Sequence, residues 1–381
     1  MSHTYRTLFT WIIVLFPILA IYASPIAKVS IGDIALFLTL PVVCLRYFFG
    51  RKSVFSKVQF TVILFVLYIA VAFLIQIFSD FPVEFISTAR YIFFLLVLIF
   101  GYDYFDSKSA LKYITAISVV LSVWVMFQFI SFYFFTIIIP WNIPFLPVID
   151  NKFIEVVNEP YFLQYYRPTG VFYEPTHFVQ YTLIALIANV VVPSFRSASK
   201  RFILIMAIIM SASSLGLIAL ILVFLYKVFI VDGLKISPIY ILLFLALLIV
   251  ITPLLSSIEY FSFIVTRVID VESGGLGPAF GYRFDSLKEL FTNTDIIKWL
   301  FGTGRGSEDA YFTGIFYLLN SIGLIGLILY FAIIVCIVRK SNQFGKMLAI
   351  IVFLLSFGSE IVANYGLLFY IPFCKFDGGK I

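Results

Sequence analysis

The apolar run at Val58–Phe78, VQFTVILFVLYIAVAFLIQIF, decides the fold of this chain. It carries no charged side chain, and a helix needs about 20 mostly apolar residues to cross a bilayer. The whole chain shares this character, with a mean hydropathy of +1.09, 62% hydrophobic residues and only 12% charged residues. These values lie far outside the range of soluble domains. The sequence therefore predicts an all-α polytopic membrane protein.

Similar runs recur along the chain and predict a single transmembrane domain, residues 1–381, with about 12 spans. The expected spans are Leu8–Ala23, Ile34–Tyr47, Val58–Phe78, Phe85–Phe100, Tyr113–Ile139, Phe178–Val192, Phe202–Ser214, Leu217–Ile230, Ile239–Leu255, Phe312–Val338, Met347–Phe357 and Ile361–Phe373. The short pair around Ser211–Gly216 leaves half-helices or a tight hairpin open as alternatives.

Most of the basic residues fall on one side of this span pattern. They are Arg6, Arg46, Arg51, Lys52, Lys57, Lys108, Lys112, Arg196, Lys200, Arg201, Lys227, Lys235, Arg339, Lys340, Lys346, Lys375 and Lys380. Short cytoplasmic loops carry the excess of Lys and Arg, so both termini are expected in the cytoplasm. The net charge of +6 is therefore a topology signal, and no nucleic-acid partner is expected.

Two long loops are expected on the outer face, at about Pro140–Pro175 (140–175) and Ser256–Tyr311 (256–311). Their Pro-rich and Gly-rich segments are typical of irregular structure and not of further spans. The three cysteines, Cys44, Cys336 and Cys374, lie in or beside apolar runs and show no disulfide or metal-ligand spacing. The sequence predicts no metal and no cofactor, and function is expected in the outer loops.

The first loop ends in RPTGVFYEPTHF at residues 167–178, which gathers a cation, an acid and an imidazole before an apolar run. Arg167 is a candidate for binding phosphate oxygens, because its planar fork matches them. An ion pair with Glu159 or Glu174 is the structural alternative.

Glu174 and His177 are the candidates for proton transfer. Glu174 precedes Pro175, which favours the first turn of a helix, so its carboxylate can either cap that helix or act as a base. His177 titrates near neutral pH and can move a proton or bond a substrate hydroxyl. A purely structural histidine is the alternative.

Tyr166 and Tyr173 belong to an aromatic group around Arg167. Aromatic faces stack on the apolar side of sugar rings, while tyrosine hydroxyls bond the ring edge. Tyrosines also gather at membrane interfaces for anchoring alone, which is the competing interpretation.

The second loop adds the cations Arg267, Arg283 and Arg305 and the glycines Gly302 and Gly304. Glycine permits turns that aim several N–H groups at one anion, so Gly302 and Gly304 are candidates for substrate binding, as are the cations Arg267 and Arg305, although Gly-x-Gly-x-Gly alone is a weak signal. Arg283 is, like Arg167, a candidate catalytic cation. It is not a Walker A motif, because no Gly-Lys-Ser/Thr follows.

The segment 167–178 resembles the Arg-x-x-Gly-x-Phe-x-Glu-Pro-Ser/Thr signature of Wzy-type O-antigen and exopolysaccharide polymerases, a family related to O-antigen ligases. The segment MSASSLGLIAL at 210–220 is similar to the family's Ser-rich turn, although Leu215 stands where the family often has Arg. Arg283, WLFGTGRG at 299–306 and LNSIGLIGL at 319–327 resemble the Arg, Gly-x-Gly and Gly-Leu-Ile-Gly succession near the end of these proteins.

The resemblance implies a membrane glycosyltransferase of the bacterial cytoplasmic (inner) membrane. It would join undecaprenyl-pyrophosphate-linked oligosaccharide repeat units into O-antigen or a related surface glycan. Arg167, Arg283 and Arg267 are then expected to hold the pyrophosphate, and Glu174 or His177 to take the acceptor proton. A chain-length regulator and a flippase are implied as partners.

Three alternatives remain open at this point. An O-antigen ligase would use the same donor but transfer the glycan to lipid A–core, and the Glu-Pro-Thr motif favours the polymerase over it. A transporter or lipid-linked glycan flippase would place polar groups along several spans, but Gln76, Gln128 and Asn189 are scattered. A structural subunit without activity is disfavoured by the clustering of Arg, Glu and His.

Overall fold

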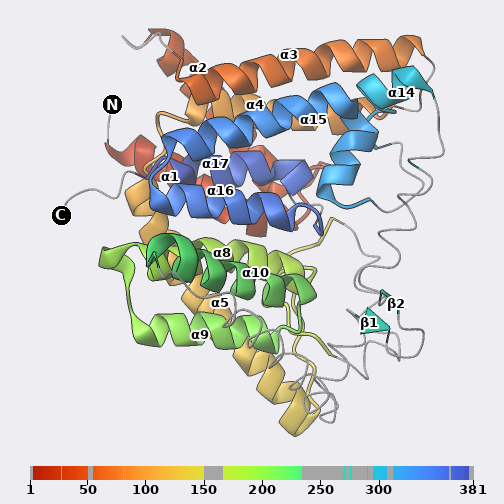
Figure 1. Ribbon diagram of the computed structural model, residues 1–381. Helices are drawn as coiled ribbons and strands as arrows, with labels where there is room; N and C mark the ends of the chain where they lie inside the picture. Colours follow the sequence, from red (N-terminus) through yellow and green to blue (C-terminus); the bar gives the residue numbers. More distant parts are fainter. Residues whose placement is uncertain are drawn as a thin grey trace. The chain divides into compact units, whose positions relative to one another are not determined.

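A computed structural model describes residues 3–26, 28–49, 55–79, 81, 83–149, 166–233, 269–270, 275–276, 290, 295–306, 312–359 and 362–376. In this part of the chain the structure is helical, except for β1 (Ile269–Asp270) and β2 (Gly275–Leu276), which pair antiparallel (Figure 1). The chain divides into two compact units. Unit 1 comprises residues 1–114 and 285–381, and unit 2 comprises residues 115–284.

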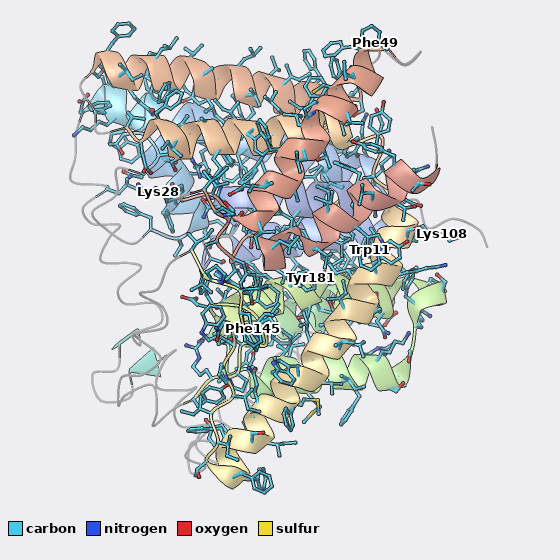
Figure 2. All side chains as sticks on the ribbon, turned by 180° about the vertical axis from the view of Figure 1, so that it is seen from behind. Trp11, Lys28, Phe49, Lys108, Phe145 and Tyr181 are labelled. Carbon is cyan, nitrogen blue, oxygen red and sulfur yellow. The ribbon has the colours of Figure 1, made fainter. Side chains whose placement is uncertain are left out.

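Five helices in the described part are long and apolar enough to cross a membrane. They are α2 (Ile31–Phe49), α3 (Lys57–Phe78), α5 (Ser107–Phe135), α10 (Ser214–Tyr226) with its π-helical extension Lys227–Val231, and α15 (Gly314–Lys340). Large apolar side chains are exposed on several of them, such as Phe49, 85% exposed at the end of α2 (Figure 2). Exposed apolar surface on this scale suits a lipid environment. These helices support a multi-pass membrane protein.

Unit 1 is completed by shorter elements: α1 (His3–Leu19), α4 (Phe85–Gly101), α14 (Ile296–Phe301), α16 (Gln343–Leu355), the π-helical turn Val362–Gly366 and α17 (Leu367–Cys374). α15 lies along α3 and α14, and α17 contacts α16, α4 and α1 (Figure 1).

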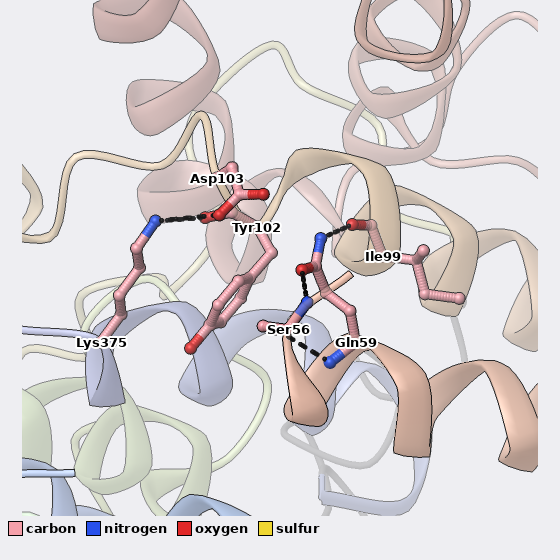
Figure 3. Close-up of polar contacts among 6 residues, drawn as sticks. All are labelled: Ser56, Gln59, Ile99, Tyr102, Asp103 and Lys375. Atoms are coloured by element: carbon pink, nitrogen blue, oxygen red, sulfur yellow. Dashed lines mark hydrogen bonds and ion pairs between the residues drawn. The ribbon is translucent and has the colours of Figure 1, made fainter. Parts of the chain in front are cut away.

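The segments that connect the helices of unit 1 contact one another in two separate sets, one at each end of the unit. At one end, Lys28 and Glu84 approach to 3.7 Å, the Glu84 N–H donates to Arg305 O and the Gly314 N–H to Ser359 O. At the other end, Lys375 Nζ lies 3.5 Å from Asp103 Oδ1, and Gln59 Nε2 donates to Ile99 O (Figure 3). The first set of connections is the one expected outside and the second the one expected inside.

α15 is broken at Gly323, whose φ of 68° and ψ of −178° are non-helical. Side chains of α3 bond the carbonyls at the break: Tyr68 donates to Ile322 O at 2.6 Å and Gln76 to Ser321 O at 3.0 Å. The same two side chains also donate to the carbonyls of Leu300 and Phe301, the last residues of α14. A break at membrane depth requires such partners, because lipid offers none.

Unit 2 contains most of α5, then α8 (Pro175–Val191), the 3-10 turn Pro193–Phe195, α9 (Ala198–Met210) and α10. Every residue of α8 is buried except His177. α10 approaches α8 closely, because a Cβ on Gly216 would lie 2.9 Å from Val179 Cγ2. α9 and α10 are joined by a tight turn in which Ala212 has a φ of 49°.

Candidate functional site

Gln128 holds the segment that carries the candidate residues. This side chain of α5 is buried, and its Oε1 accepts from the Gly170 N–H at 2.9 Å, while Nε2 donates to Gly170 O at 3.2 Å. Gly170 has a φ of 70°, which glycine adopts without strain. Residues 166–174 are therefore fixed to α5 by their own backbone.

Tyr166 also anchors this segment. Its hydroxyl donates to Ile139 O at 3.0 Å, its carbonyl accepts from the Tyr133 hydroxyl at 3.0 Å, and its ring lies 4.9 Å from that of Phe132. Burial, with a smaller contribution from Tyr133, raises the pKa of the Tyr166 phenol, so it stays a donor at neutral pH. This geometry gives Tyr166 a structural role in holding the segment.

Tyr173 is less enclosed than Tyr166. It is half-buried, and its ring lies 4.8 Å from the Trp141 ring with 58° between the planes. Two aromatic faces of this kind offer a surface on which a sugar ring can stack. Tyr173 therefore remains a candidate for substrate contact.

Glu174 occupies the N-cap of α8, with extended φ and ψ of −130° and 150°, and Pro175 begins the helix. Its backbone carbonyl accepts from the His177 and Phe178 N–H groups at 3.1 and 3.4 Å. Its side chain makes no capping hydrogen bond. The position is thus the predicted one, but the carboxylate is not used as a cap, which leaves it available for chemistry.

His177 lies on the first turn of α8, ahead of the apolar run that begins at Phe178. Burial lowers the pKa of His177, and the charge of Glu174 opposes this in part. The imidazole is therefore neutral at pH 7 and able to accept a proton. Arg167 is half-buried at the start of the same segment, so the described part of unit 2 contains the cation, the acid and the imidazole of the motif.

The Ser-rich turn lies beside this motif. Thr176 Oγ1 and Ser213 Oγ are 3.5 Å apart in a buried position, and Ser213 caps α10 by accepting from the Gly216 N–H. Sequence reasoning did not select Gln128, Thr176 or Ser213 as site residues. The signal for Gln128 was present, because a lone amide in an apolar run needs a partner.

Gly302 and Gly304, in unit 1, serve close packing. Their N–H groups donate to Lys298 O at 2.8 Å and Ser321 O at 3.2 Å, and Thr303 N–H donates to Asn320 O at 2.7 Å. A Cβ on Gly302 would lie 2.5 Å from the Ser321 carbonyl carbon. The Gly302 N–H ends α14, and the Thr303 and Gly304 N–H groups bond the broken helix α15, so the geometry favours packing over an anion cradle.

Arg305 follows these glycines and is only 3% exposed. Arg267 and Arg283 lie outside the described residues, so their predicted roles have no structural account.

Among the described residues, no group of three or more His, Cys, Asp or Glu side chains is placed to hold a metal ion. No family model, curated protein or solved structure matches the chain.

Proposed function

We propose that this protein is a polysaccharide polymerase that joins undecaprenyl-pyrophosphate-linked oligosaccharide repeat units at the outer face of the bacterial cytoplasmic membrane. The observation that carries the proposal is the placement of Glu174 at the start of α8, with its carboxylate not used for capping, one turn from a neutral His177. The resemblance of residues 167–178 to the polymerase signature supplies the substrate class.

The proposed reaction is a glycosyl transfer. A hydroxyl oxygen at the non-reducing end of the acceptor attacks the anomeric carbon of the donor glycan. The bond from that carbon to the pyrophosphate oxygen breaks, and undecaprenyl pyrophosphate leaves with the bonding electrons. Glu174 or His177 takes the hydroxyl proton, as general bases do. No ATP is needed, because the lipid pyrophosphate bond supplies the driving energy.

Cations stabilise the departing pyrophosphate in this scheme. Arg167, Arg283 and Arg267 are proposed to hold its oxygens, since guanidinium groups bind phosphate in bidentate geometry. Tyr173 contributes an aromatic face to the acceptor. Replacement of Arg283 by Lys is expected not to restore polymer, because an ammonium lacks the fork.

The proposed topology goes beyond the five described helices that are long enough to cross a membrane. It has about 12 spans, both termini in the cytoplasm and the loops 140–175 and 256–311 outside. A chain-length regulator and a flippase are proposed as partners. The separation of the two sets of connections at the ends of unit 1 supports this arrangement.

Transport is the less favoured function, because buried amides of the spans have structural partners. Gln76 donates to Phe301 O, Gln128 bonds Gly170, and Asn189 donates to Phe195 O. An O-antigen ligase remains the second candidate, since it would use the same donor and the same membrane face.

Surface glycan from cells that lack this gene distinguishes the candidates on a gel. The polymerase proposal expects loss of the ladder of long chains, with single repeat units still attached to lipid A–core. Loss of every attached repeat, with long lipid-linked polymer accumulating, would establish a ligase instead. An unchanged ladder would refute both.

A further inference from the structure

Arg305 is a buried cation that the described residues leave incompletely bonded. It lies in the connection after α14, its side chain is 3% exposed, and its Nη2 donates to Asn364 Oδ1 at 3.1 Å. Its Nε and Nη1 have no hydrogen-bond partner in the described part of the chain. No ion pair among the described residues includes Arg305.

Two tyrosines hold the guanidinium group in place. The Arg305 Cζ lies 4.0 Å from the ring centroid of Tyr91 in α4 and 5.0 Å from that of Tyr317 in α15. Contacts of this kind attract a cation to the aromatic faces and leave its N–H edges free. The Tyr91 hydroxyl is also buried and has no partner among the described residues. The N–H groups of Nε and Nη1 are therefore held in place, and no described residue uses them.

Two carboxylates in the described part of unit 1 have other cations as partners. Glu84, whose N–H bonds Arg305 O, forms its ion pair with Lys28, and Asp33 pairs with Arg90 at 2.8 Å. A buried guanidinium without a counter-charge is costly. Asn364 is exposed, so Arg305 lies one side chain away from solvent.

We propose that Arg305 binds a phosphate-class oxyanion through one edge of its guanidinium group, with Tyr91 and Tyr317 holding the guanidinium plane. Asn364 accepts from one Nη2 hydrogen, and the other Nη2 hydrogen is parallel to an N–H of Nε or Nη1, so two oxygens of one phosphate group match two parallel N–H donors. This deepens the proposed function and rests on it only for the source of the oxyanion, which would be the pyrophosphate of the lipid-linked substrate. The site itself is defined by residues of unit 1 alone.

The test measures binding to the full-length protein in phosphatidylcholine nanodiscs. One arm titrates inorganic pyrophosphate, and the other uses nanodiscs that contain undecaprenyl pyrophosphate, with unfolding temperature as the readout. We expect saturable stabilisation in at least one arm, weakened about tenfold or more in Arg305→Lys because the ammonium loses one of two charge-assisted bonds. Stabilisation in the lipid arm alone would assign the oxyanion to the carrier.

A second variant covers the risk that Arg305→Lys fails to fold. Asn364→Asp places a carboxylate beside Nη2, so it should raise the unfolding temperature without ligand and weaken oxyanion binding. Asn342→Asp is the matched control: it adds the same charge, retains the cap of α16 and should leave binding unchanged.

Equal binding by the wild type, Arg305→Lys and Asn364→Asp would overturn the site, as would no binding in either arm. Both results are independent of polymer formation. A polymerase that fails to bind oxyanion at Arg305 would refute this inference alone, while binding without any polymer would refute the proposed function alone.

Discussion

Glu174 and His177 lie within one turn of α8, and their protonation sets the pH range of the proposed reaction. Because burial lowers the pKa of His177 from its usual 6.5, its imidazole takes up a proton only at lower pH. We expect the transfer rate to hold from pH 7 to below 6.5 and then fall, with this acid limb lost in His177→Gln. An acid limb at or above pH 6.5, or one that persists in His177→Gln, would contradict this role.

Removal of the Glu174 carboxylate gives a separate prediction. Glu174→Gln should lower the transfer rate about 100-fold or more, as expected when a general base is lost. The fold should be unaffected, because the side chain makes no capping bond and the backbone carbonyl still accepts from His177 and Phe178. The transfer rate and the unfolding temperature of the same preparation check the lowered rate and the unchanged fold. A rate near the wild-type value would exclude Glu174 as the base.

Gln128 supports the site from α5. Gln128→Leu leaves the buried N–H and carbonyl of Gly170 without partners, so we expect a loss of about 2 kcal/mol of stability, together with a lower transfer rate. Gln128→Glu separates the two bonds, because it can still accept from the Gly170 N–H but, when ionised, no longer donates to Gly170 O. Wild-type stability and rate in Gln128→Leu would show that residues 166–174 need no such anchor.

At the scale of elements, the break in α15 depends on glycine. A Cβ on Gly323 would lie 2.3 Å from Leu300 O, and φ and ψ of 68° and −178° are a region almost restricted to glycine. Gly323→Ala should therefore cost about 3 kcal/mol or more. Gly233→Ala is the control, since Gly233 has a φ of 64° but nothing within 4 Å of its added Cβ.

Thermal unfolding of the two variants checks this prediction. Gly233→Ala is expected to cost only the strain of a left-handed alanine, about 1 kcal/mol. Equal unfolding temperatures for the two variants would mean that α15 straightens without penalty.

The positions of the helices could largely be predicted from the apolar runs, and their ends less well. The expected span Val58–Phe78 matches α3, and Phe85–Phe100 matches α4. Each expected span overlaps a described helix, except Ile239–Leu255, which lies outside the described residues. α5 begins at Ser107 and not at Tyr113, because apolarity marks depth in a bilayer and not where a helix starts.

The break at Gly323 could not be predicted. Glycine is common in transmembrane helices, and Phe312–Val338 reads as one continuous span. What identifies the break is a set of bonds from Tyr68 and Gln76 of α3, which only the fold brings together. The packing role of Gly302 and Gly304 could not be predicted either, because it depends on contacts with the α15 backbone that only the fold brings about.

For the candidate site, the sequence predicted the position of Glu174 but not the state of its side chain. Pro175 indicates where α8 begins, because proline suits the first turn. Whether the preceding carboxylate caps the helix depends on its rotamer, which the motif does not determine. Gln128 was visible as a polar residue in an apolar run, but its partner Gly170 is a contact made only in the fold.

At the scale of the whole molecule, the topology is tested at two lysines at opposite ends of unit 1, Lys28 and Lys108 (Figure 2). Both are exposed. In a chain whose Cys44, Cys336 and Cys374 are replaced by Ala, a membrane-impermeant maleimide should label Lys28→Cys in intact cells. Lys108→Cys should be labelled only after lysis. Labelling of both in intact cells, or the reverse order, would contradict the proposed orientation.

The central claim is that this chain alone elongates a lipid-linked glycan. The most direct measurement incubates the purified protein in vesicles with undecaprenyl-pyrophosphate-linked repeat units and no nucleotide, then resolves the products by mass. We predict chains of two and more repeats with release of undecaprenyl pyrophosphate, and loss of both products in Glu174→Gln. Unchanged single repeats with the wild-type protein would contradict the account, whereas equal products with Glu174→Gln would leave His177 as the base.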